Sequence, residues 1–192
     1  MDIKDKLISN ILDIEVNMFL TVTTKQKSSC QNYPESFKIH RRAQFIPWSA
    51  ETLESYLNDL RAAEKNNINL MKFKYARMDN LIPTVNDNPL IKKITGILLD
   101  WQEVFFENYP NIAMKARPVS SSGNTMNTTS FETYLSGELE TYSNKTLELL
   151  YKDVMGKKSR GINMSEEIYT YLVTSLGYES LQDVEEKNGL VK

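Results

Sequence analysis

The sequence predicts an all-α protein, a single-domain multi-helix bundle over residues 1–192 with one long irregular loop. Apolar residues recur at the spacing of an amphipathic helix along most of the chain, and long alternating runs typical of strands are absent. Serine or asparagine caps and helix-opening prolines precede several of these segments. A chain of 192 residues suits one domain with a sizeable core.

The elements can be placed in order along the chain. A first amphipathic helix is expected over residues 3–20. A second opens at Pro34, whose fixed φ suits the first helical turn, and runs toward Phe45. A third follows the N-cap Ser49, and a fourth, "NLMKFKYARM", follows the cap Asn69. Each of these four helices has one apolar side that the fold must bury.

The next segment, "NPLIKKITGILLDWQEVFF", has the strongest apolar stripe in the chain. Asn88 is expected to cap it, with Pro89 at its first helical position. Residues 110–128 then lack periodicity and form the predicted long loop, a kind of segment that is usually functional or mobile. Two shorter helices are expected after it, one from about Asn163 and one from Ser180.

Residues 127–150 are predicted to form one long helix with two unusual features. Thr129 and Glu132 match a capping box, and Glu132 and Glu138 fall at the borders of the apolar face. A glycine in mid-helix costs about 1 kcal/mol relative to alanine, so we expect another backbone or a flat ligand to approach there. The glycine belongs to a strip of small residues, Thr133, Gly137 and Thr141.

The composition excludes several classes of function. Hydrophobic residues make up 41% of the chain, charged residues 25%, and the formal net charge is −2. This lacks the basic character of a nucleic-acid-binding protein. No stretch approaches the roughly 20 apolar residues of a membrane span, and acidic residues interrupt the N-terminal helix, unlike a signal peptide. We therefore expect a cytoplasmic protein without nucleic-acid or membrane partners; its oligomeric state is open.

Cys30 and His40 are the only residues of their kinds. The counts exclude an internal disulfide, a cysteine zinc cluster and a site with several histidines, so we expect no metal site. Whether the aromatic-rich core binds a cofactor is open, and the sequence shows no dedicated ligand residue for one. Cys30 lies just before a predicted helix start, where the helix dipole would lower a thiol pKa. A nucleophile and base pair is one hypothesis for these two residues, and a packed thiol with a surface histidine is the other.

Several charged residues fall on apolar faces, where a charge needs a partner. Glu15 lies inside the first stripe, Arg41 between Phe37 and Phe45, and Lys74 on the face of its own helix. One interpretation is a set of separate ion pairs that fix the helix register. The other is a central polar pocket in which such groups shift one another's pKa values. Further candidates for the pocket are Tyr75, Arg77, Arg117, Glu132, Tyr134, Glu138 and Tyr142.

Five motifs give the sequence a family resemblance: "SCQNYPESFKIHRRAQF", "WSAETLESYLNDL", "NLMKFKYARM", "YPNIAMKARP" and "TSFETYLSGELETYSNKTLELL". Together they resemble the bacterial family called domain of unknown function 4125, over nearly the whole chain. The resemblance implies no particular activity. Its motif residues coincide with the misplaced polar groups, which favours a site: Glu15, Cys30, Gln31, Arg41, Gln44, Lys74, Tyr75, Arg77, Arg117, Glu132, Tyr134 and Glu138.

Two functions from different classes follow. In the first, the central pocket binds a small anionic ligand and performs acid–base chemistry on it. Glu15 or Glu138 would accept the proton, Arg41 and Lys74 would hold the anion, and Tyr75 or Tyr134 would orient it. In the second, the protein is a regulatory or adaptor module that docks a partner helix on the strip of small residues. Convergence of the misplaced charges on one place would favour the first function.

Overall fold

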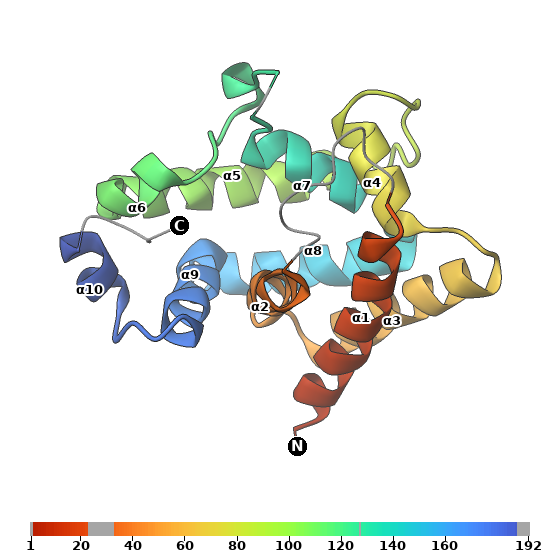
Figure 1. Ribbon diagram of the computed structural model, residues 1–192, viewed down its shortest axis with the longest axis horizontal. Coiled ribbons are helices and arrows are strands. Elements are labelled where there is room, and N and C mark those ends of the chain that lie inside the picture. Colours follow the sequence, from red (N-terminus) through yellow and green to blue (C-terminus); the bar gives the residue numbers. More distant parts are fainter. Residues whose placement is uncertain (1, 23–32, 127, 188–192) are drawn as a thin grey trace.

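The computed structural model describes residues 2–22, 33–126 and 128–187, and these residues form helices and no β-strand (Figure 1). The all-α class is therefore confirmed. None of the described helices is both long and apolar enough to cross a membrane. The elements are α1 (Ile3–Leu20), α2 (Pro34–Phe45), α3 (Ala50–Lys65), α4 (Leu70–Met78), α5 (Leu90–Asn108), α6 (Pro110–Lys115), the 3-10 turn η2 (Ser121–Gly123), α7 (Phe131–Leu139), α8 (Asn144–Lys158), α9 (Met164–Ser175) and α10 (Leu181–Glu186).

Most predicted helix starts are confirmed by their capping hydrogen bonds. The side chain of Ser49 accepts from the Thr52 amide at 3.2 Å, and that of Asn69 accepts from the Lys72 amide at 3.0 Å. Asn163 and Ser180 cap α9 and α10 in the same way. α5 begins one residue later than predicted, at Leu90, and the Asn88 side chain accepts from its amide at 2.9 Å. These caps satisfy amides that have no partner inside their own helix.

The predicted loop over residues 110–128 is wrong in its first part, which forms the helix α6. Pro110 occupies a first-turn position, where its missing N–H costs nothing. Glu185 of α10 accepts from the amides of Asn111 at 2.7 Å and Ile112 at 3.0 Å. A distant carboxylate therefore caps α6, and the local sequence does not reveal it.

The predicted single helix over residues 127–150 is also wrong, because the chain turns between α7 and α8. Ser130, and not Thr129, caps α7 by accepting from the Thr133 amide at 3.2 Å. Ser143 starts α8 by accepting from the Thr146 amide at 3.2 Å. An uninterrupted helix would lack the second cap. The apolar face expected along one helix over residues 127–150 is therefore divided between α7 and α8.

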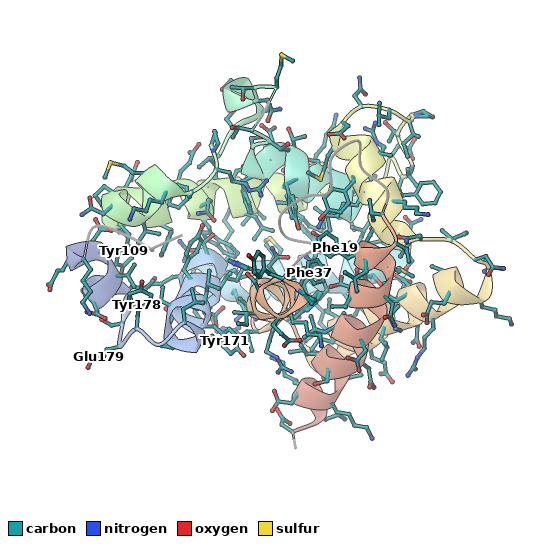
Figure 2. All side chains as sticks on the ribbon, viewed as in Figure 1. Phe19, Phe37, Tyr109, Tyr171, Tyr178 and Glu179 are labelled. Atoms are coloured by element: carbon teal, nitrogen blue, oxygen red, sulfur yellow. The ribbon has the colours of Figure 1, made fainter. Side chains whose placement is uncertain are left out.

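Two apolar clusters lie under the helices. The larger one takes side chains from α1, α2, α3, α4, α5, α7, α8 and α9, and it includes Phe19, which stacks on Phe37 with ring centroids 4.4 Å apart (Figure 2). The smaller one lies where the end of α5 meets α6, α9 and α10, near the labelled Tyr109 and Tyr178. The larger cluster surrounds the polar groups described next.

Candidate functional site

Four charged side chains from four helices meet in the interior. Glu15 of α1, Arg41 of α2, Lys74 of α4 and Glu138 of α7 are 0%, 2%, 1% and 6% exposed. We call these four residues the charge cluster. It contains two carboxylates and two cations, so its formal charges balance. These four charges therefore meet as the sequence predicted. Hydrogen bonds link them into one connected group and not into separate pairs.

Arg41 is the hub of the charge cluster. Its Nε and Nη2 donate to the two oxygens of Glu15 at 2.8 and 2.7 Å. Its Nη2 and Nη1 also donate to the two oxygens of Glu138 at 2.8 and 3.1 Å, and Nη1 donates to Gln44. A guanidinium has five N–H donors, and all five are used here. Arg41 therefore has no donor left for a ligand, which argues against its predicted role of holding an anion.

Two tyrosines complete the hydrogen bonding of the carboxylates. Tyr56 of α3 donates to Glu15 Oε1 at 2.7 Å, and Tyr142 donates to Glu138 Oε1 at 2.5 Å. Burial raises the pKa of both phenols, and the adjacent carboxylate raises it further. Both tyrosines therefore remain protonated donors. Tyr142 was expected beside the site. Tyr56 was not, because a tyrosine in the apolar stripe of α3 gives no sign of which residue its hydroxyl will contact.

Lys74 is the least compensated member of the charge cluster. Its Nζ donates to Glu138 Oε2 at 2.6 Å, which is its one hydrogen-bond acceptor among the described residues. The same atom lies 3.7 Å from the ring centroid of Tyr134 and 6.0 Å from that of Tyr75. An ammonium has three N–H donors, so aromatic faces replace acceptors on part of this one.

The cluster shifts the pKa values of its members in different directions. Burial lowers the pKa of Lys74, although Glu138 opposes the shift. Burial disfavours a charged Glu138, yet Arg41 and Lys74 hold its pKa well below the usual range. Glu138 is therefore a weak base near neutral pH. Glu15 accepts three hydrogen bonds inside the protein, so neither carboxylate fits the predicted role of proton acceptor well.

Tyr75 and Tyr134 lie beside the ammonium as predicted. Burial raises the pKa of Tyr134 to about 12, with a further contribution from Glu138. Burial also raises the pKa of Tyr75 to about 12, and Tyr134 adds to this shift. Both phenols therefore remain protonated across the ordinary pH range.

Arg77 does not join the charge cluster. It forms a separate pair with Glu140, from Nε to Oε2 at 2.6 Å and from Nη2 to Oε1 at 3.1 Å. Arg77 also donates to the Ile82 carbonyl at 2.7 Å, and Glu140 accepts from the Val85 amide at 3.1 Å. The pair therefore fastens the segment after α4 onto the end of α7. Glu140 is 9% exposed, because the turn after α7 directs it inward.

Arg117 and Glu132 lie at the outer side of α7. Arg117 is exposed, donates to the Thr129 carbonyl at 3.0 Å, and has its Cζ 4.8 Å from the Tyr134 centroid. Arg117 thus approaches the charge cluster only through the Tyr134 ring. Glu132 accepts from the Ser121 amide at 2.6 Å, which gives it a structural partner outside the charge cluster, and its role as a ligand contact stays a prediction.

Gly137 lies at a close approach of α7 to α4. A Cβ atom at this position would lie 3.1 Å from Met78 Cγ and 3.2 Å from the Lys74 carbonyl oxygen. The predicted close approach is therefore correct, and the neighbouring backbone belongs to the same chain. At Gly137 the close neighbour is therefore α4 of the same chain, and the docking of a partner helix on the strip stays a prediction. The contact also brings Lys74 within reach of Glu138.

Two further expectations from the sequence concern the pairing of Cys30 with His40 and the binding of a metal. His40 is exposed, and Cys30 lies outside the described residues, so their pairing stays a prediction. Among the residues that the structure describes, no group of three or more histidine, cysteine, aspartate or glutamate side chains is arranged to hold a metal ion.

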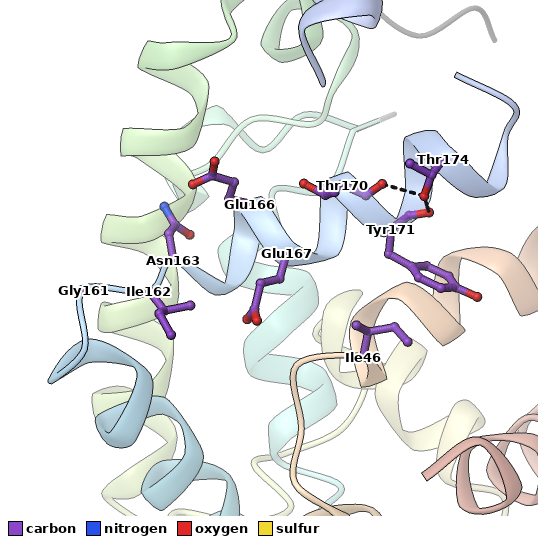
Figure 3. A pocket seen from close by; sticks show the side chains of 9 residues that line it. All are labelled: Ile46, Gly161, Ile162, Asn163, Glu166, Glu167, Thr170, Tyr171 and Thr174. Carbon is purple, nitrogen blue, oxygen red and sulfur yellow. Dashed lines mark hydrogen bonds between the residues drawn. The ribbon is translucent and has the colours of Figure 1, made fainter. Parts of the chain in front are cut away.

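A surface groove of about 650 Å³ lies elsewhere, beside α9 (Figure 3). Ile46 lines it from the end of α2, and Glu166, Glu167 and Tyr171 line it from α9. Glu167 pairs with Lys157 at 2.7 Å. No member of the charge cluster lines this groove, and its acidic lining is unsuited to an anion.

Comparison with known proteins places the chain in a family. The model of the family described as Protein of unknown function (DUF4125) matches residues 5–186, which includes every member of the charge cluster. No curated protein and no solved structure matches the chain. The match covers nearly the whole sequence, and the chain therefore belongs to the DUF4125 family.

Proposed function

We propose that this protein binds a small anionic ligand at Lys74. The observation that supports the proposal is a fully buried ammonium with one hydrogen-bond acceptor, Glu138, among the described residues. Buried charges in proteins are normally paired and fully hydrogen-bonded. An ammonium is a point charge with three N–H donors, and it is suited to a carboxylate or phosphate group.

The members of the site have different roles in this proposal. Lys74 contacts the anion. Arg117, which also contacts the Tyr134 ring, supplies a second cation. Arg41 and Glu15 are positioning residues, because Arg41 fixes both oxygens of Glu138. The charge cluster alone is neutral, so Arg117 gives the whole site a net positive charge that favours an anion.

The same arrangement supports acid–base chemistry by Lys74. Its pKa is lowered, whereas that of Glu138 lies too low for a general base near neutral pH. Lys74 is therefore the group that we expect to give and take a proton. Tyr75 would remain a hydrogen-bond donor throughout the reaction, since its pKa is about 12.

Thermal unfolding in the presence of simple anions tests the binding proposal. Inorganic phosphate and malonate are the probes, titrated into the wild type, Lys74→Met and the control Lys72→Met, which removes an exposed lysine of the same helix. A ligand at 100 times its Kd stabilises a protein by about 2.7 kcal/mol. We expect at least one probe to stabilise the wild type and Lys72→Met, and neither to stabilise Lys74→Met. Equal stabilisation of all three proteins would refute the proposal.

Native mass spectrometry complements this test when the natural ligand is larger than the probes. The wild type and both lysine variants are purified from cells under gentle conditions and weighed. We expect a mass increment on the wild type and Lys72→Met that is missing from Lys74→Met. An increment retained by Lys74→Met would place the bound molecule elsewhere on the protein.

A further inference from the structure

We propose that Tyr134 is a gate: its ring closes the Lys74 site, and rotation of the side chain opens that site to solvent. This inference rests on the proposed function, since it concerns the regulation of the same site. It assigns Tyr134 a part in access to Lys74, where the sequence had indicated only an orienting hydroxyl.

The Tyr134 ring contacts one buried cation and one exposed cation. Lys74 is 1% exposed, and its Nζ lies 3.7 Å from the ring centroid. Arg117 is exposed, and its Cζ lies 4.8 Å from the same centroid. Tyr134 as a whole residue is half-buried. Tyr134 therefore stands at the boundary between the ammonium and the surface, and a ligand that approaches Lys74 from this side must displace it.

The backbone around the gate is firmly held, so the movement belongs to the side chain. The first amides of α7 donate to the segment before it, Phe131 N to Pro118 O at 2.8 Å and Glu132 N to Val119 O at 3.0 Å. The Tyr134 amide donates to the Ser130 carbonyl at 3.1 Å. These bonds satisfy the free amides at the start of α7 and fix its first turn. Side-chain rotation is the remaining local movement that uncovers Lys74.

Arg117 holds the gate closed from outside. Its guanidinium is oriented by the hydrogen bond from Nη1 to the Thr129 carbonyl at 3.0 Å. A cation on an aromatic face attracts the ring, and the attraction is stronger for a desolvated cation such as Lys74. The two cations thus stabilise the closed ring position together, and an anionic ligand that engages either cation would weaken that hold.

Lysine acetylation measured residue by residue tests the gate directly. Each protein is treated briefly with acetic anhydride, and mass spectrometry gives the rate at Lys74 relative to the exposed Lys72. The variants are Tyr134→Ala, which removes the ring, and Tyr134→Phe, which keeps it. We expect Tyr134→Ala to raise the Lys74/Lys72 ratio by about tenfold or more, the scale on which a buried cation–π contact shifts an opening equilibrium. Tyr134→Phe should leave the ratio near that of the wild type.

An unchanged ratio in folded Tyr134→Ala would overturn the gate, and so would an equal rise in Tyr134→Phe. If circular dichroism shows that Tyr134→Ala does not fold, Arg117→Gln replaces it, because this exposed residue is tolerant of substitution. Loss of the outer cation should raise the ratio by about two- to threefold, and no rise would again overturn the proposal. The assay contains no ligand, so the gate and the anion binding are confirmed or refuted separately.

Discussion

Arg41 shows how a buried charge is made tolerable in this protein. Desolvation disfavours its charge, yet Glu138 and Glu15 raise its pKa well above the ordinary value. Buried ion pairs add little net stability compared with a well-packed apolar core, but loss of one partner leaves an uncompensated charge. The charge cluster is therefore sensitive to every single substitution among its members.

Glu138→Gln should reduce the free energy of unfolding at pH 7 by about 3–5 kcal/mol, because Arg41 and Lys74 lose their shared counter-ion. Urea unfolding measures this loss. The control is Glu64→Gln on α3, an exposed glutamate, which should change stability by no more than about 0.5 kcal/mol. A loss in Glu138→Gln as small as in the control would contradict the account.

The pH dependence gives a second prediction at the same residue. The pKa of Glu138 in the folded protein lies below its ordinary value of 4.5, which represents the unfolded chain, so the unfolded state binds the proton first as the pH falls. The stabilisation is complete above pH 4.5 and is lost as the pH falls below it. We expect stability of the wild type to decline more steeply below this pH than that of Glu138→Gln. Parallel declines would show that Glu138 contributes nothing to acid sensitivity.

The packing of helix α7 against helix α4 sets the position of Lys74. Gly137 lets the α4 backbone approach so closely that a methyl group there would meet the Lys74 carbonyl at 3.2 Å. Gly96 of α5 offers the opposite case, since a Cβ atom there would have nothing within 4 Å. Alanine substitutions at the two glycines therefore distinguish the steric cost of an added methyl group from the gain in helix propensity.

Gly137→Ala should destabilise the protein by about 1 kcal/mol, because overpacking outweighs the gain in helix propensity. Gly96→Ala should instead stabilise it by up to about 1 kcal/mol, since only the propensity changes. Thermal and urea unfolding of both variants provide the comparison. Equal stabilisation of the two would show that α4 can move away from Gly137 at no cost.

The elements differ in how far the sequence predicted them. Local chemistry located the caps Ser49, Asn69 and Asn163, because a cap and its amide lie within three residues. Hydrogen bonds between residues far apart in the chain could not be predicted from local sequence. Glu185, for example, caps α6 from 74 residues away. The same limit explains the missed hydrogen bond between Tyr56 and Glu15, since an apolar stripe does not show where a hydroxyl points.

The candidate site was predicted in part for a physical reason. A charge on an apolar face must find a partner, so the misplaced residues Glu15, Arg41, Lys74 and Glu138 were expected to meet, and they do. The sequence did not predict which of these four residues would have its hydrogen-bonding capacity filled inside the protein. The use of all five Arg41 donors and the one acceptor that Lys74 has among the described residues depend on the three-dimensional arrangement, and the proposed role of Lys74 rests on them.

At the scale of the whole molecule, the charge cluster joins parts of the chain that are far apart in sequence. Arg41 and Glu138 are separated by 97 residues, Lys74 and Glu138 by 64, and Arg41 and Glu15 by 26. With Tyr56, the cluster ties together α1, α2, α3, α4 and α7. Such a group can form only when these helices have packed, so its members should behave as one unit.

The charge balance of the cluster gives a way to measure whether its members act together. Glu15→Gln leaves the charge cluster with one excess positive charge, and Lys74→Met leaves it with one excess negative charge. The double variant keeps a neutral pair, Arg41 with Glu138. Glu15 and Lys74 make no hydrogen bond to each other and are linked through Arg41 and Glu138. Any coupling between them therefore reports on the cluster as a whole.

The most direct test is a double-mutant cycle of Glu15→Gln and Lys74→Met, followed by urea unfolding at pH 7. We predict that the double variant is at least about 1 kcal/mol more stable than the sum of the two single losses implies. Additive losses within the usual error of about 0.3–0.5 kcal/mol would mean that the two residues belong to independent pairs, and would contradict a single coupled site.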